Sequence, residues 1–116
     1  QQLLLENASE VITIYEDDES IRYISPSVET ILGYDQKELI GSSDIDNVKE
    51  EYHEVMKGFF QKLREHPEER ASVQYEYKTK SGEFIWIETT GTNAMSNPAI
   101  HGFILNSRDI TERRRA

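Results

Sequence analysis

The chain has 116 residues, of which 36% are hydrophobic and 30% are charged, and its formal net charge is −9. This length can close one modest core, and the composition is that of a folded domain rather than a disordered chain. The lack of cysteine excludes disulfides, thiolate catalysis, cysteine-ligated metals and flavin photochemistry through a cysteine adduct. The acidity argues against nucleic-acid binding, and no apolar run reaches the roughly 20 residues that span a bilayer. We therefore expect a cytoplasmic domain without direct membrane contact.

The chain opens on an apolar segment that is followed by a predicted β-hairpin. Leu3, Leu4 and Leu5 precede polar residues. We expect residues 1–10 to be an incoming helix or linker, which continues from preceding sequence in a longer protein. β-Branched and aromatic residues then dominate 11–15 and 21–24, on either side of an acidic turn. Such runs around a polar turn predict two antiparallel strands.

Helices are predicted between residues 25 and 66. We expect Ser25 to cap a short helix that has Pro26 in its first position and ends at Gly33. Residues 34–48 indicate short helical turns, whose apolar anchors are Leu39, Ile40 and Ile45. A longer helix is predicted over 49–65, because apolar residues fall on one face of it at helical spacing: Tyr52, Val55, Met56, Phe59, Phe60 and Leu63.

Three further strands are predicted in the last part of the chain. Residues 72–79 alternate between apolar and polar side chains, residues 84–89 follow a Lys-Ser-Gly turn, and the last strand is expected from Ile100 to about Ser107. Two strands, several helices and then three strands are typical of an α+β domain, with helices gathered on one face of an antiparallel sheet.

Three segments in this order resemble signatures of the PAS family. Residues 25–34 read SPSVETILGY, residues 80–86 read KSGEFIW, and residues 108–113 read RDITER. The resemblance spans nearly the whole chain, with 11–110 as the PAS domain and 111–116 as the start of a C-terminal linker helix. It implies a five-stranded antiparallel sheet in the order 2-1-5-4-3, with helices that cover a small-molecule pocket. Ser25 and Ser81 stand where many members have Asn and Asp, and serine forms similar caps and turns.

We expect the pocket between the inner sheet face and the helices. Its candidate lining consists of the inward positions of those elements: Ile14, Val28, Leu32, Leu39, Ile45, Met56, Phe59, Tyr75, Tyr77, Ile87, Thr89 and Leu105. The competing interpretation is that most of them are only core. Tyr75, Tyr77 and Thr89 carry hydroxyls that need a partner when buried, which a ligand or a water can provide.

No residue pattern identifies a cofactor or a catalytic centre. His53 lies on the helix where some haem-binding PAS domains present an axial imidazole, but a half-exposed surface histidine is the simpler interpretation. A non-covalent flavin has no positive signal. His66 and His101 lack the spacing of a zinc site, so we expect no transition metal. Strand alternation points Glu76 and Glu88 away from the pocket, and no phosphate loop or catalytic triad is present. We therefore expect a domain that is not an enzyme.

The opposite face of the sheet is the predicted interaction surface. Alternation places Phe84 and Trp86 on this outer face, where two large aromatic side chains would need cover. Leu3, Leu4 and Leu5 could supply that cover, as a helix from the same chain or from a dimer mate, and we expect a homodimer. In the alternative, Trp86 is half-buried under loops without a partner.

The C-terminal exit of the domain is the predicted signal path. Asp109 and Thr111 lie where the last strand ends, and the resemblance implies that this exit leads to an output domain in the same chain, such as a histidine kinase or a diguanylate cyclase. Asp109 also suits an ordinary helix N-cap. We expect a sensory input and dimerisation module of a two-component or similar pathway, which binds a small molecule and relays the change through this strand. A ligand-free structural relay is the alternative, a small enzyme on the same sheet ranks third, and the ligand stays open.

Overall fold

The five-stranded sheet expected for this sequence is present in the structure, a computed structural model that describes residues 8–116. The strands are β1 (Val11–Tyr15), β2 (Ile21–Ile24), β3 (Ala71–Lys78), β4 (Phe84–Asn93) and β5 (Phe103–Asp109). They pair antiparallel in the order β2-β1-β5-β4-β3. The α-helices are α2 (Val28–Ile31), α3 (Gln36–Leu39), α4 (His53–Glu65) and α5 (Thr111–Arg115), and two 3-10 turns are η1 (Ile45–Asn47) and η2 (Glu50–Tyr52). The predicted fold class is therefore confirmed.

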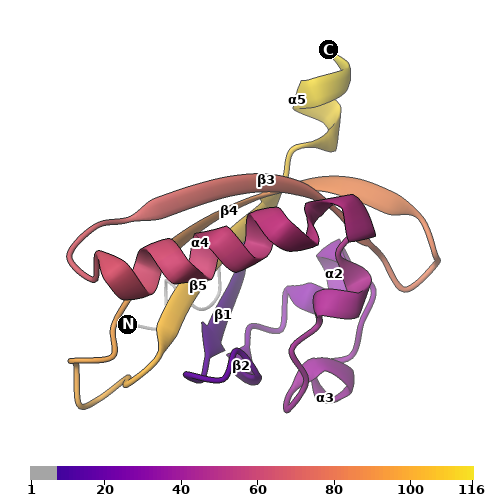
Figure 1. The fold of residues 1–116 in the computed structure, drawn as a ribbon. Helices are drawn as coiled ribbons and strands as arrows, with labels where there is room; N and C mark the ends of the chain where they lie inside the picture. The colour runs from indigo at the N-terminus through magenta and orange to yellow at the C-terminus, as the bar shows by residue number, and fades with distance from the viewer. Residues whose placement is uncertain (1–7) are drawn as a thin grey trace.

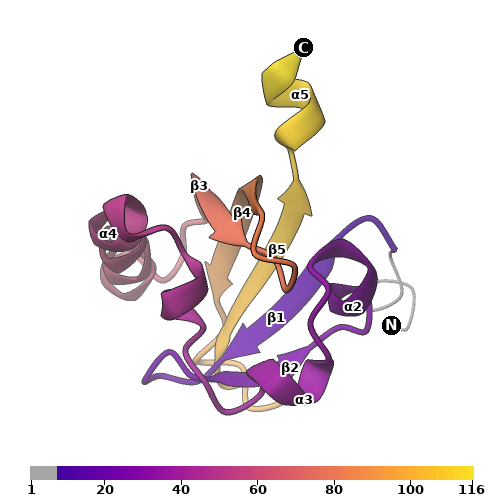
Figure 2. The same ribbon diagram turned by 90° about the vertical axis from the view of Figure 1, so that its right-hand side faces the viewer.

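The helices before β3 cover one face of the sheet, whereas α5 extends beyond the end of β5 and contacts the start of β4. α4 runs alongside β3 and packs on β3 and β4 (Figure 1). α2 and α3 lie near the other end of the sheet, beside β1 and β2, and α5 projects away from the end of β5 (Figure 2). Buried side chains from both helical groups and from the strands join in one core, which includes Val28, Leu32, Leu39, Met56, Phe59, Leu63, Phe103 and Leu105. No helix in the described part of the chain is long and apolar enough to cross a membrane.

Alternation along each strand decides which side chains face this core. In β3 and β4 the predicted faces are correct, since Tyr75 and Ile87 are opposite one another and both are buried. The prediction that Ile14 faces inward is wrong: Thr13 and Tyr15 are buried on the inner face, and Ile14 lies on the outer one. β1 carries apolar side chains on both faces, so its alternation does not distinguish them.

Two residues predicted as apolar anchors are exposed instead. Ile40 and Val55 each retain 45% of their accessible surface. The stripe of α4 that faces the sheet consists of Met56, Phe59, Phe60 and Leu63, at the spacing i, i+3, i+4 and i+7. Val55 lies one residue, or 100°, away from Met56 and therefore at the edge of the buried face. Tyr52 belongs to η2, because α4 begins only at His53.

The helix cap predicted at Ser25 does not form. Ser25 is only 1% exposed, and its Oγ accepts a hydrogen bond of 2.9 Å from the Ile12 N–H. The same hydroxyl lies 2.9 Å from the hydroxyl of Ser27. α2 begins at Val28 with Ser27 in the N-cap position. Ser25 therefore ties the segment before α2 to β1.

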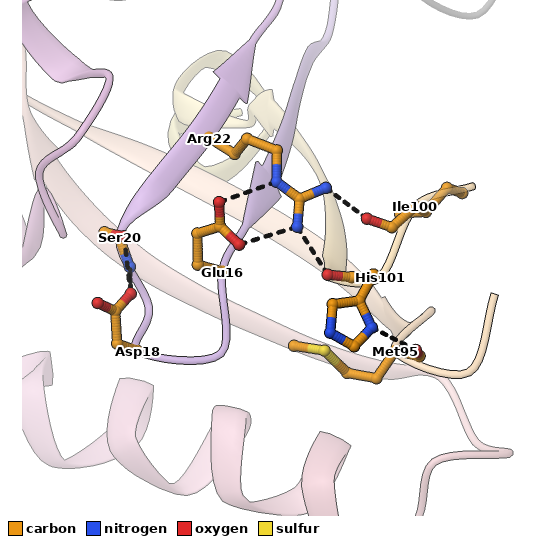
Figure 3. Close-up of polar contacts among 7 residues, drawn as sticks. All are labelled: Glu16, Asp18, Ser20, Arg22, Met95, Ile100 and His101. Carbon is orange, nitrogen blue, oxygen red and sulfur yellow. Dashed lines mark hydrogen bonds and ion pairs between the residues drawn. The ribbon is translucent and has the colours of Figure 1, made fainter. Parts of the chain in front are cut away.

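β5 begins at Phe103, later than the predicted Ile100, because the preceding residues are bound to the β1–β2 hairpin. Arg22 donates two hydrogen bonds to the carboxylate of Glu16, at 3.0 and 2.8 Å, and further ones to the main-chain carbonyls of Ile100 and His101 (Figure 3). His101 has φ +50°, which is incompatible with an extended strand. The strand can therefore start only after this residue.

Candidate functional site

The inner face of the sheet borders a cavity of about 360 Å³, which is within the size range of small-molecule sites. Its lining comes from β1, the β1–β2 turn, the segment around η1, α4 and β3: Tyr15, Asp18, Glu19, Ser43, Asp44, Ile45, Val48, His53, Glu54, Met56, Lys57, Phe60, Tyr75 and Tyr77. A void of about 20 Å³, enough for one water molecule, shares Tyr15, Asp44, Tyr75 and Tyr77 with it.

Asp44 places a carboxylate in the wall of both spaces, between two tyrosine hydroxyls. Tyr15 donates to Oδ1 at 3.0 Å, and Tyr77 donates to Oδ2 at 2.7 Å. The Asn47 side-chain amide donates to the Tyr77 hydroxyl at 3.2 Å, which leaves the hydroxyl hydrogen directed at Asp44. Asp44 has φ +49°, a left-handed conformation that aspartate adopts more readily than most residues. The loop conformation thus turns the carboxylate toward the strands.

The charge of Asp44 has no nearby compensation. Burial raises the pKa of Asp44 to about 6, although both tyrosine hydrogen bonds act in the opposite direction. Within residues 8–116, no lysine, arginine or histidine forms an ion pair with it. Burial also raises the pKa of Tyr15 and of Tyr77, so both hydroxyls remain donors. At pH 7 the cavity therefore contains a mostly ionised carboxylate without a cation.

Tyr75, Thr89 and Ser107 form a chain of hydroxyls across β3, β4 and β5. The Tyr75 and Thr89 oxygens lie 2.6 Å apart, and those of Thr89 and Ser107 lie 2.7 Å apart. Burial raises the pKa of Tyr75 to about 12, against the lowering effect of these contacts. The three hydroxyls predicted to need a ligand or a water, on Tyr75, Tyr77 and Thr89, thus all have protein partners.

The predicted pocket residues fall into three groups. Those that line the larger cavity are Ile45, Met56, Tyr75 and Tyr77, and those that line only the small void are Leu32 and Ile87. The remainder are core residues, namely Val28, Leu39, Phe59, Thr89 and Leu105, or lie on the outer face, as Ile14 does. Asp44 and Tyr15 are absent from the prediction. Asp44 stands in a Gly-Ser-Ser-Asp loop, which signals a turn but not the direction of its carboxylate.

The histidines add little to this site. His53 lines the cavity, and its Nε2 donates to the Val48 carbonyl at 2.8 Å, so a haem iron would have to break this bond to bind that nitrogen. A ring nitrogen of His66 and one carboxylate oxygen each of Glu68 and Glu69 lie within 4.8 Å of one another, a proximity that their sequence spacing did not indicate. All three of these side chains are exposed, and acidic surface groups often gather without an ion.

The outer face has a covered aromatic end and an open aliphatic groove. The Arg114 guanidinium lies 3.7 Å from the ring centroid of Trp86, and Tyr52 meets this ring edge-on at 5.7 Å. Trp86 is therefore half-buried by its own chain, while Phe84 is 39% exposed. The groove has a volume of about 850 Å³, and its aliphatic wall consists of Ile12, Ile14, Ile100 and Ile104. The predicted cover, Leu3, Leu4 and Leu5, lies outside the described residues.

The two predicted relay residues meet at the end of β5. Thr111 Oγ1 accepts a hydrogen bond of 2.8 Å from the main-chain N–H of Trp86, and the Ile110 N–H donates to the Trp86 carbonyl at 2.9 Å. Asp109 Oδ1 accepts from the Thr111 N–H at 2.8 Å. Asp109 is the last residue of β5, and Ile110 occupies the N-cap position of α5. Asp109 thus lies one residue before the N-cap position, and its side chain links the end of β5 to the first residue of α5.

Comparisons with known proteins agree with this architecture. The profile of the family described as the PAS fold matches residues 2–110. The PAS domain of a protein from Colwellia psychrerythraea superposes with a TM-score of 0.81 at 18% identity, over 97% of this chain and 95% of that chain. A sensory box histidine kinase/response regulator from Burkholderia thailandensis E264 gives a TM-score of 0.74 at 25% identity, over 98% of this chain and 86% of that chain. No curated protein sequence matches this one.

Proposed function

The chain belongs to the PAS family, and on that premise we propose that it is the sensory input module of a cytoplasmic signalling protein and binds a small molecule in the 360 Å³ cavity. The observation that carries this proposal is the cavity, in whose wall the Asp44 carboxylate stands among four aromatic rings, with Asp18, Glu19, His53, Glu54 and Lys57 also in the lining. Ligand sites typically combine aromatic and apolar walls with polar groups that fix the orientation of the ligand. The similarity to a sensory box histidine kinase supports a signalling context, with an output domain in the same chain.

The path from the cavity to the exit supports a relay along the sheet. Tyr75 lines the cavity, and the hydroxyl chain through Thr89 and Ser107 connects it to β5, which ends at Asp109. A ligand signals only if it binds two arrangements of the protein with different affinity. We propose that such a ligand shifts β5 and thereby α5. Asp109→Ala then uncouples the input from the output in the full signalling protein while this domain stays folded.

Ligand binding is tested by thermal unfolding of the chain with a panel of metabolites, after an absorption spectrum has reported any haem or flavin. Ile45→Trp fills the cavity and removes the ligand-induced rise in melting temperature, whereas Ile40→Trp, at an exposed position nearby, preserves it. If no compound stabilises the unmodified chain, the ligand-free relay replaces this proposal.

Dimerisation is a second proposed role, which the aliphatic groove on the outer face favours. Ile14, Ile100 and Ile104 of its wall are partly exposed, and apolar surface patches are typical of interaction sites. We propose that the groove, rather than the covered Trp86, receives Leu3, Leu4 and Leu5 of a second copy of the chain. Sedimentation equilibrium is the test: Ile14→Asp places a charge in the groove and shifts the protein to monomer, while Ile40→Asp does not. A monomer at every concentration before mutation contradicts the proposal.

The position of Asp44 meets the condition for the enzymatic alternative, which required an acid that faces inward. Glu76 and Glu88 face outward as predicted, since they belong to the outer register of β3 and β4. We nevertheless propose binding without turnover. Burial raises the pKa of Tyr15 and of Tyr77, so neither hydroxyl exchanges its proton readily with Asp44 near pH 7. Recovery of an unchanged ligand after long incubation is the result expected.

A further inference from the structure

We propose that the 360 Å³ cavity selects organic cations, and that a protonated amine or guanidinium group of the ligand forms an ion pair with Asp44. This inference rests on the proposed function and adds the chemical class of the ligand. It depends on three observations, namely the free acceptor positions of Asp44, the aromatic wall and the charge of the lining.

Asp44 retains acceptor capacity that faces the cavity. A carboxylate has about four acceptor positions, and the hydroxyls of Tyr15 and Tyr77 occupy two of them. The side chain lines both the large cavity and the small void, so its free positions are directed at space that a ligand can enter. An ionised carboxylate that is partly withdrawn from water and left without a cation is unfavourable, and a cationic ligand provides the missing charge.

The rings around Asp44 suit the same class of ligand. Tyr15 and Phe60 pack edge to face with centroids 5.4 Å apart, and Tyr75 and Tyr77 do so at 6.4 Å. All four rings line the cavity. The faces of aromatic rings attract cations, and the rings also offer apolar contact to the body of the ligand. An anionic ligand would gain only the apolar contact and would be repelled by Asp44.

The other charged side chains of the lining also favour a cationic ligand. Four acids, which are Asp18, Glu19, Asp44 and Glu54, stand against one lysine, Lys57, so the lining carries 1 − 4 = −3 with His53 neutral. Lys57 is itself paired with Glu54 at 3.5 Å. Arg64, outside the lining, pairs with Glu19 at 2.9 Å, which leaves the excess negative. A cavity lined by one sign of charge raises the local concentration of ions of the opposite sign.

The test is calorimetric titration of the full 116-residue chain with primary amines and guanidines of graded size, including 2-phenylethylamine. Each cation is paired with a neutral alcohol or amide of the same shape and with a carboxylate. We expect at least one cation to bind about tenfold more tightly than its neutral partner, as a desolvated charge pair allows. Asp44→Asn abolishes this preference, whereas Glu54→Gln changes it less than about twofold, because an exposed ion pair is worth little.

The outcomes separate this inference from the proposed function. If neutral or anionic compounds bind as tightly as the cations, the cation inference is overturned and the cavity remains a ligand site. If nothing binds, both are overturned. Cation binding that is unchanged in Asp44→Asn also overturns the assignment to this residue. Should that variant fail to fold, the pH dependence of binding to the unmodified chain decides, since affinity must fall as Asp44 is protonated below about pH 6.

Discussion

Tyr77 of β3 donates a hydrogen bond of 2.7 Å to Asp44, which lies on the loop between α3 and η1. This contact joins the edge strand of the sheet to the segment that closes the cavity. Tyr15 bonds the other carboxylate oxygen from β1, so that one loop residue connects two strands that are not neighbours in the sheet. The geometry is favourable for hydrogen bonding and unfavourable for the charge, because the carboxylate is desolvated without a cation.

We predict that Asp44→Asn raises the free energy of unfolding at pH 7.5. The pKa of Asp44 is about 6 in the folded chain and 3.8 ordinarily, so the folded state binds the proton of Asp44 more tightly than the unfolded state does. The stabilisation that this proton gives is fully present below pH 4 and is lost as the pH rises through 6. The difference of about 2 corresponds to roughly 3 kcal/mol at most, since the cavity leaves the residue partly exposed. Urea unfolding at pH 4 and at pH 7.5 measures the effect.

The control for this prediction is the difference in the free energy of unfolding between Asp44→Asn and the unmodified protein, taken at each pH. The other titratable groups around the cavity are the same in both proteins: Tyr15, Tyr75, Tyr77, Asp18, Glu19, His53, Glu54 and Lys57. We expect the advantage of the variant to be small at pH 4 and to grow toward pH 7.5. An advantage that is equal at both pH values would contradict the raised pKa.

Asp44 also illustrates which part of the site a sequence can predict. The faces of β3 and β4 are predictable, because polar and apolar residues alternate there and Tyr75 and Ile87 fall on one side. β1 lacks that contrast, so the prediction placed Ile14 on the wrong face. The direction of Asp44 depends on a left-handed loop conformation and on contacts with strands 29 and 33 residues away along the chain. No local pattern encodes such contacts.

The hydroxyl chain across the sheet predicts an order of mutational effects. Thr89→Val removes the central hydroxyl, which contacts both Tyr75 and Ser107, and leaves buried polar groups short of a partner, at a cost of about 1–3 kcal/mol. Tyr75→Phe costs less, about 1 kcal/mol, because Thr89 and Ser107 still bond each other. Urea unfolding of both variants is the measurement, and a larger loss in Tyr75→Phe would contradict the proposed chain.

The single tryptophan reports on the docking of α5. Thr111→Val removes the acceptor of the main-chain N–H of Trp86, and loss of one such bond lowers the equilibrium constant for docking of α5 about fivefold. Arg114 then leaves the Trp86 ring, so we expect a red-shifted emission and stronger quenching by acrylamide. Thr92→Val, on the same face of β4 but in the aliphatic groove, is the matched control. Identical spectra for all three proteins would show that Thr111 does not hold α5.

Gly91, which lies against α4, and Gly58, which lies within it, predict opposite effects of the same substitution. A Cβ added at Gly91 of β4 would lie 2.7 Å from Phe59 Cζ and 3.1 Å from Leu63 Cδ1, so Gly91→Ala forces α4 away from the sheet. We expect a loss of about 1–3 kcal/mol, as in other overpacked cores. A Cβ at Gly58, within α4, meets nothing within 4 Å, and Gly58→Ala stabilises the helix by about 0.5–1 kcal/mol.

Melting temperatures of the two glycine variants measure this difference directly. Because both changes add one methyl group, the sign of each shift depends on the space at that position and not on the chemistry added. Phe59→Leu combined with Gly91→Ala shortens the side chain that meets the new methyl group, and we expect it to recover part of the loss. A stabilising Gly91→Ala would mean that α4 does not approach β4 as closely as the structure has it.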